Sequence, residues 1–164
     1  MPSTRIMNLL IFVSSAAIIA TALYMQHVME LTPCYLCITQ RVFFITIGAL
    51  GLLAFLHNPK AAGSRIYATL TAFLSVAGGY FSGKQLWLQS LPEDQVPACG
   101  PPAEYLFEAF PLSEALSMLL RGDGNCAKVQ WTFLDISSPG WALVAFVGFL
   151  VVAILQMLRK DLPT

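Results

Sequence analysis

Four apolar stretches of this 164-residue chain are each long enough to cross a lipid bilayer. A spanning helix needs about 20 apolar residues, because the hydrocarbon core of a bilayer is about 30 Å thick. The chain is 57% hydrophobic and only 11% charged, which lies well outside the usage of water-soluble domains. We therefore predict an all-α membrane protein with one domain, residues 1–164, built as a bundle of four transmembrane helices. The predicted spans are residues 6–24, 33–56, 66–83 and 139–158.

Charged residues predict the orientation of this bundle, because Lys and Arg near helix ends favour the cytoplasmic side. Basic residues near the ends of the spans lie beside the two termini and in the loop 57–65; they are Arg5, Lys60, Arg65, Arg159 and Lys160. The only acidic residue on this side is Asp161. The acids of segments 25–32 and 84–138 fall on the other side; they are Glu30, Glu93, Asp94, Glu104, Glu108, Glu114, Asp123 and Asp135. We predict cytoplasmic termini and outer segments 25–32 and 84–138. The net charge of zero gives no reason to expect a nucleic acid partner.

The long outer segment, residues 84–138, contains five prolines, which favour a mobile loop with short helical pieces over one rigid domain. One such piece is predicted from Leu112 to Leu120, where leucines recur at helical spacing and Gly122 follows as a terminator. This amphipathic helix would either lie flat on the membrane or pack on a small core of the loop. In the third span, Gly78, Gly79 and Gly83 predict close packing against a neighbouring helix.

A Cys-X-X-Cys motif, Cys34 to Cys37, opens the second span. This spacing lets the two sulfurs form and break a small disulfide ring, which suits thiol–disulfide exchange. Thr32 is a good helix cap and Pro33 a favoured first helical residue, so we predict that both sulfurs lie in the first turns of a helix. The partial positive charge of the helix terminus favours a thiolate there.

All four cysteines, which include Cys99 and Cys126 of the long loop, are predicted on the outer side, where an oxidising compartment favours disulfides. A zinc ribbon would need two closely spaced pairs, and covalent haem would need histidine where Ile38 stands, so we expect no metal. Static disulfides are the serious alternative: a Cys99–Cys126 bridge would contribute about 3.6 kcal/mol through chain entropy. A Cys34–Cys37 bridge closes almost no loop, so its purpose is better explained by chemistry than by stability.

Arg41 lies one helical turn beyond Cys37 and on the same predicted face. If the helix begins near Pro33, Arg41 lies about 12 Å along it, at or just inside the hydrocarbon boundary. A charge at that depth is costly and indicates function, although an arginine can also extend outward to lipid phosphate. A thiolate at Cys37 beside Arg41 would face an oxidant carried by the lipid, for which a membrane quinone is the natural candidate.

Several motifs, in order along nearly the whole chain, resemble those of the bacterial disulfide bond formation protein B (DsbB) family. They are His27-Val28-Met29, Pro33-Cys34-Tyr35-Leu36-Cys37, Gln40-Arg41, Leu86-Trp87-Leu88-Gln89-Ser90-Leu91-Pro92, Ala98-Cys99-Gly100, Asn125-Cys126-Ala127, Gln130-Trp131-Thr132-Phe133-Leu134 and Pro139-Gly140-Trp141.

The resemblance implies a Gram-negative inner-membrane thiol oxidase with periplasmic cysteines, which reoxidises a soluble thioredoxin-fold partner of the DsbA type and passes two electrons to ubiquinone or menaquinone. It implies a partner-facing disulfide Cys99–Cys126, with Cys99 forming the mixed disulfide, and a quinone-facing pair Cys34–Cys37. Arg41 matches the arginine that polarises the quinone. Cys126 would then attack Cys34 and leave Cys37 as the thiolate that engages the quinone.

The chain departs from the family pattern at Gln40, where many members have glutamate, and at Lys84 and Ser90; these positions bear on quinone affinity. Three alternatives are weighed beside the main interpretation. One is a paralogue serving a dedicated thioredoxin-fold partner. Another is a vitamin K epoxide reductase-like protein, which the order of the two cysteine pairs disfavours. The third is a non-catalytic membrane scaffold held by static disulfides.

Overall fold

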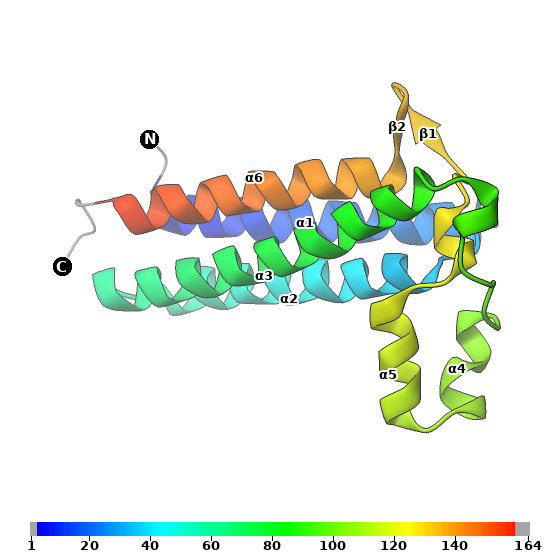
Figure 1. The fold of residues 1–164 in the computed structure, drawn as a ribbon. Coiled ribbons are helices and arrows are strands. Elements are labelled where there is room, and N and C mark those ends of the chain that lie inside the picture. Colours follow the sequence, from blue (N-terminus) through cyan, green and yellow to red (C-terminus); the bar gives the residue numbers. More distant parts are fainter. Residues whose placement is uncertain (1–2, 160–164) are drawn as a thin grey trace.

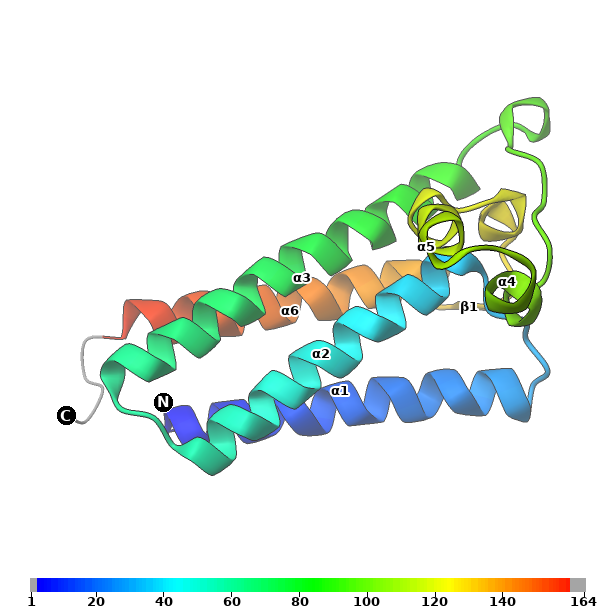
Figure 2. The ribbon, with the colours of Figure 1, turned by 90° about the horizontal axis from the view of Figure 1, so that it is seen from below.

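Four long helices lie side by side in the computed structural model, which describes residues 3–159 (Figure 1). They are α1 (Thr4–His27), α2 (Tyr35–His57), α3 (Ala61–Gln89) and α6 (Ser138–Leu158). Helix α1 packs on α2, α2 on α3, and α3 on α6, as the second view also shows (Figure 2). The start of α1 and the end of α6 lie at one end of the bundle, and the shorter elements lie at the other. Lys160 and Asp161, used above to predict orientation, lie outside the described residues.

Three helices of the described chain, α1, α2 and α6, are long and apolar enough to cross a membrane. Helix α3 is longer, but its buried face carries hydroxyl groups and small residues that lower its hydropathy. The hydroxyls of Ser75 and Ser82 donate to backbone carbonyls one turn earlier, at 2.7 and 3.2 Å, so these buried polar groups are satisfied within the helix. The outer face of α3 is apolar, and the ring of Phe73 is 70% exposed. The third predicted span, residues 66–83 within α3, therefore stays a prediction.

Gly78 allows α3 and α6 to approach closely. A Cβ atom at Gly78 would lie 2.4 Å from the ring of Phe146, which is buried and stacked on Phe44 with ring centroids 4.1 Å apart. A Cβ at Gly79 would make only ordinary contacts, and a Cβ at Gly83 would meet nothing within 4 Å. Close packing is therefore confirmed at Gly78, while Gly83 faces open space.

Helix α3 continues to Gln89, six residues past the end of the predicted span, and the segment that joins it to α6 covers residues 90–137. Its ordered pieces cover the cysteine-bearing end of the bundle. They are a 3-10 turn (Glu93–Gln95), α4 (Ala103–Ala109), α5 (Leu112–Arg121), a second 3-10 turn (Gly124–Ala127) and an antiparallel hairpin of β1 (Thr132–Phe133) and β2 (Ile136–Ser137).

Helix α5 is anchored to the bundle through its last carbonyl groups. The Thr39 hydroxyl donates to the carbonyl of Leu119 at 3.1 Å, and the Lys84 ammonium donates to that of Leu120 at 3.0 Å. A cation at a helix C-terminus also interacts favourably with the helix dipole. Leu119 is buried in the loop core, whereas three other leucines are exposed; they are Leu112, Leu116 and Leu120. The helix thus packs on the loop core through one face, and contact of the other face with a membrane remains a prediction.

Candidate functional site

Cys34 caps helix α2. The helix begins at Tyr35, so the expectation of Thr32 as cap and Pro33 as first helical residue is wrong by two residues. The reason is that Cys34 has an extended backbone and its Sγ accepts a hydrogen bond from the Cys37 N–H at 3.3 Å, in the place that a serine or aspartate oxygen usually takes. The expectation that Cys37 lies in the first turn of the helix is met.

The sulfurs of Cys34 and Cys37 lie 2.7 Å apart, with no disulfide bond between them. Gln85 from α3 approaches them from the interior of the bundle. Its Nε2 lies 3.2 Å from Cys34 Sγ and 3.3 Å from Cys37 Sγ. Its Oε1 accepts a hydrogen bond of 2.8 Å from Gln40 Nε2. The Cys-X-X-Cys pair therefore has a buried polar group beneath it.

Cys126, 92 residues beyond Cys34 in the chain, is brought against it by the fold. Cys126 is fully buried, and Cys34 is 7% exposed. The pKa of Cys126 is lowered, chiefly because the Cys34 thiol donates a hydrogen bond to its sulfur. Backbone hydrogen bonds from Asp123 and Leu36 also lower it, whereas burial and the negative charge of Asp123 raise it. Cys126 and Cys34 thus pack in one buried cluster, where the neighbouring Cys34 thiol lowers the pKa of Cys126.

Cys99 is exposed, but its segment lies along the segment that carries Cys126. The Gly124 N–H donates to the Ala98 carbonyl at 3.3 Å, and a Cβ at Gly124 would lie 3.2 Å from Cys99 Sγ. The buried carboxylate of Asp123 joins the two segments, because it accepts hydrogen bonds from the Gly100 N–H at 2.8 Å and the Cys126 thiol at 3.4 Å. One cysteine of the loop therefore faces solvent and the other faces the Cys-X-X-Cys pair.

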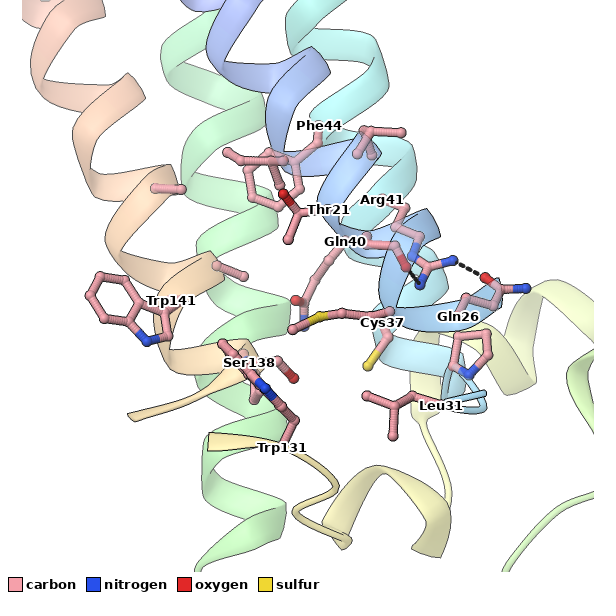
Figure 3. A pocket seen from close by; sticks show the side chains of 18 of the residues that line it. Thr21, Gln26, Leu31, Cys37, Gln40, Arg41, Phe44, Trp131, Ser138 and Trp141 are labelled. Atoms are coloured by element: carbon pink, nitrogen blue, oxygen red, sulfur yellow. Dashed lines mark hydrogen bonds between the residues drawn. The ribbon is translucent and has the colours of Figure 1, made fainter. Parts of the chain in front are cut away.

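Arg41 points from α2 toward α1. Its guanidinium donates to the Gln26 side-chain oxygen and, at 3.2 Å, to the Ala22 carbonyl (Figure 3). These two acceptors lie near the end of α1, so the charge is held beside the bundle end rather than in its centre. Arg41 and Cys37, which were predicted to lie on the same face of the helix, line the same cavity.

A cavity of about 470 Å³ opens between α1, α2, α6 and the hairpin segment. Aromatic rings form part of its wall, and the polar side chains of Cys37, Gln40 and Arg41 also line it, with Arg41 bonded to Gln26 (Figure 3). The aromatic lining residues are Phe44, Trp131, Phe133 and Trp141. The hairpin is held there by a hydrogen bond of 3.1 Å from the Trp141 ring to the Phe133 carbonyl. Such a lining suits a flat, mostly apolar ring that carries hydrogen-bond acceptors.

Three features of this site were not predicted. Gln85 and Asp123 each stand just before a motif named above but are not part of it, and only their burial against sulfur distinguishes them. The hairpin lacks the usual Asn-Gly signal: its turn residues Leu134 and Asp135 take positive φ angles of 53° and 61°. The alternation of Trp131 and Phe133 was the only available signal for it.

The chain is similar over nearly its whole length to a known protein family and to several of its members. The family model described as "Disulfide bond formation protein DsbB" matches residues 4–156. A "Disulfide bond formation protein B" of Saccharophagus degradans is 51% identical over 160 residues, which cover 98% of this chain and 96% of that protein. One of Hahella chejuensis is 49% identical over 96% of both chains. The "Disulfide bond formation protein B 1" of Pseudomonas aeruginosa is 42% identical over 96% of this chain and 97% of its own length.

Proposed function

The chain belongs to the DsbB family of disulfide bond formation proteins, and we propose that it oxidises a periplasmic thioredoxin-fold partner of the DsbA type and passes the electrons to a membrane quinone. As a member of this family it is a protein-disulfide oxidoreductase with membrane helices. The observation that carries the proposal is the packing of buried Cys126 and Cys34 in one cluster, beside a cavity that Cys37 lines.

Exchange begins at Cys99 in this proposal. A partner thiolate attacks Cys99 of a Cys99–Cys126 disulfide, a sulfur–sulfur bond forms to the partner, and Cys126 leaves as a thiolate. The exposure of Cys99 supports this order, because a soluble protein can reach its sulfur. The second partner thiol then displaces Cys99, which releases the partner in its oxidised form.

Cys126 carries the electrons to the Cys-X-X-Cys pair. Its thiolate attacks Cys34, the Cys34–Cys37 bond breaks, and the electron pair remains on Cys37. This exchange needs contact between sulfurs, and the lowered pKa of Cys126 supports it by favouring the attacking thiolate. Cys126 and Cys34 are thus the two ends of the transfer from loop to membrane helix.

The cavity fits a quinone head group on the chemistry of its lining. Aromatic walls suit the ring, and the side chains of Arg41, Gln26 and Gln40 offer donors for its carbonyl oxygens. A quinone, when bound, supplies an acceptor for two electrons and two protons. Arg41 would hold a carbonyl oxygen and favour negative charge on it, while the rings of Trp131 and Phe133 limit access of water. Either ubiquinone or menaquinone meets these requirements.

The location follows from the same proposal: a Gram-negative inner membrane, four spans that include α3, cytoplasmic termini and four periplasmic cysteines. The apolar outer face of α3 supports its contact with lipid, since the polar residues of its middle turns, Thr71, Ser75 and Ser82, are buried. The short elements around the cysteines all lie at the end opposite the start of α1 and the end of α6, which supports the predicted sidedness (Figure 1).

Anaerobic mixing tests the proposed function. Reduced DsbA-type partner, the purified protein and a soluble quinone analogue are combined, and partner oxidation and quinone reduction are followed together. We expect one quinone reduced per two thiols oxidised, and loss of quinone reduction in Cys37→Ser with the protein still folded. Unchanged turnover in Cys37→Ser would favour a non-catalytic scaffold, and turnover with only one special thioredoxin-fold donor would favour a dedicated paralogue.

A further inference from the structure

Gln85 is the polar side chain most closely associated with the Cys-X-X-Cys sulfurs. It lies on α3, far from Cys34 and Cys37 in sequence, and is only 2% exposed. Its Nε2 is within 3.3 Å of both sulfurs, while its Oε1 lies 3.6 Å from Cys37. A buried amide nitrogen without an acceptor would be unfavourable. The two sulfurs act as the acceptors that the Gln85 nitrogen needs.

Gln40 fixes which end of the Gln85 amide faces the sulfurs. The Gln40 Nε2 donates to Gln85 Oε1 at 2.8 Å, and Gln40 is itself 5% exposed. This hydrogen bond holds the oxygen end of Gln85, which also accepts a longer hydrogen bond of 3.6 Å from the Cys37 thiol, and it leaves the N–H groups of Gln85 for the two sulfurs. The two amides therefore form one oriented unit, which we call the Gln40–Gln85 pair.

We propose that the Gln40–Gln85 pair holds the negative charge that thiol–disulfide exchange leaves on Cys37. The place of this step in the reaction rests on the proposed function, whereas the contacts of Gln85 with the two sulfurs do not depend on it. When the Cys126 thiolate attacks Cys34, a Cys34–Cys126 bond forms, the Cys34–Cys37 bond breaks, and the electron pair stays on Cys37. The exchange is redox-neutral, and an N–H donor at Cys37 stabilises the leaving sulfur.

The position of Gln85 between the two sulfurs gives it a second property. When Cys34 and Cys37 form a disulfide, neither sulfur carries a charge, and the N–H groups of Gln85 are shared between the two sulfurs. After exchange, Cys34 is bonded to Cys126 and neutral, so both N–H groups can serve Cys37 without movement of the backbone. A glutamate at position 85 has the same shape, accepts where glutamine donates, and adds a negative charge, so it should oppose a thiolate more strongly than an apolar residue does.

Alkylation of Cys37 as the only thiol tests this role without a partner or a quinone. Cys34, Cys99 and Cys126 are replaced by serine, and the rate of reaction of Cys37 with iodoacetamide is measured at pH 7, since only the thiolate reacts. Relative to this background, we expect Gln85→Met to slow alkylation about tenfold. We expect Gln85→Glu to slow it further, and Gln40→Met to slow it about threefold through loss of orientation.

The order of the two Gln85 variants separates charge from packing. A packing role would make isosteric Gln85→Glu milder than Gln85→Met, which would overturn the proposal, as would a change of less than twofold in Gln85→Met. Gln89→Met is the matched control, because Gln89 lies one turn along α3 and its Oε1 accepts from Ser137 instead. If the Gln85 variants do not fold, Gln40→Met decides: an unchanged rate overturns the oriented pair. Failure of wild-type quinone reduction would instead contradict the proposed function and leave this result standing.

Discussion

At the scale of single residues, Arg41 and Cys37 line the same cavity but have different partners. The hydrogen bonds of Arg41 run to Gln26 and Ala22 on α1, whereas Cys37 contacts Cys34 and Gln85. The charge of Arg41 is thus placed to act on a ligand in the cavity, and the exchange of sulfurs proceeds beside it.

Replacing Arg41 should therefore impair quinone reduction and leave oxidation of the thioredoxin-fold partner unchanged. We expect Arg41→Met to raise the KM for a quinone analogue at least about tenfold, because a charged hydrogen bond to the ring oxygen is lost. Oxidation of the partner in a single turnover without quinone should keep its wild-type rate. Stopped-flow measurement of both steps checks this, and equal losses in the two steps would contradict the assigned role.

Cys126 offers a pH-dependent prediction at the same scale. Since the hydrogen bond from Cys34 is the main cause of its lowered pKa, Cys34→Ala should raise the pKa of Cys126 toward its ordinary value. The midpoint of the pH profile for Cys126 alkylation, with Cys37 and Cys99 replaced by serine, should move to higher pH. The lowered pKa also stabilises the reduced protein above the pKa of an unfolded thiol, and this contribution is lost as the pH falls through the folded pKa. An unmoved midpoint would show that Cys34 does not act on Cys126.

At the scale of elements, the long helices were predictable because each contains a long stretch that is mostly apolar, with Arg41 as the one charge of the second. The start of α2 was not, because Thr32 and Pro33 are better cap and first-turn residues by preference than Cys34 is. What decides the start is a hydrogen bond between Cys34 and Cys37 themselves. Small residues of α3 were expected to pack closely, but the burial of Thr71 and Gln85 on the same helix was not predicted.

The packing of α3 on α6 yields a matched pair of variants. Gly78→Ala would force a Cβ against the Phe146 ring, so we expect a loss of about 1–3 kcal/mol in stability. Gly83→Ala is the same change on the same helix in open space, and should stabilise the protein by about 0.5–1 kcal/mol through better helix propensity. Thermal unfolding in detergent measures both. Similar shifts for the two variants would argue against the close contact at Gly78.

At the scale of the whole molecule, the fold brings together residues that the sequence separates widely. The Cys-X-X-Cys motif and Arg41 could be identified from local spacing, but the contact of Cys126 with Cys34 depends on the loop packing of Leu106, Ala115 and Leu119. Gln85 depends in the same way on the packing of α3 against α2. Such tertiary contacts leave no periodic pattern in the chain, so they required the structure.

Sidedness is a property of the whole bundle and can be tested with single cysteines. We expect an impermeant maleimide to label Cys99 in intact spheroplasts when the other three cysteines are serine. In a cysteine-free chain, Lys60→Cys, between α2 and α3 at the opposite end, should react only after permeabilisation. Labelling of both sites in intact cells, or of Lys60→Cys alone, would contradict the predicted orientation.

The transfer from loop to membrane helix is tested most directly by trapping it. In the double variant Cys37→Ser and Cys99→Ser, only Cys34 and Cys126 remain, and their contact predicts that mild oxidation joins them in a disulfide. Mass spectrometry of the digested protein should find the peptide of Cys34 linked to that of Cys126 within single chains. Two unlinked thiols, or bonds only between separate chains, would contradict the proposed path of the electrons.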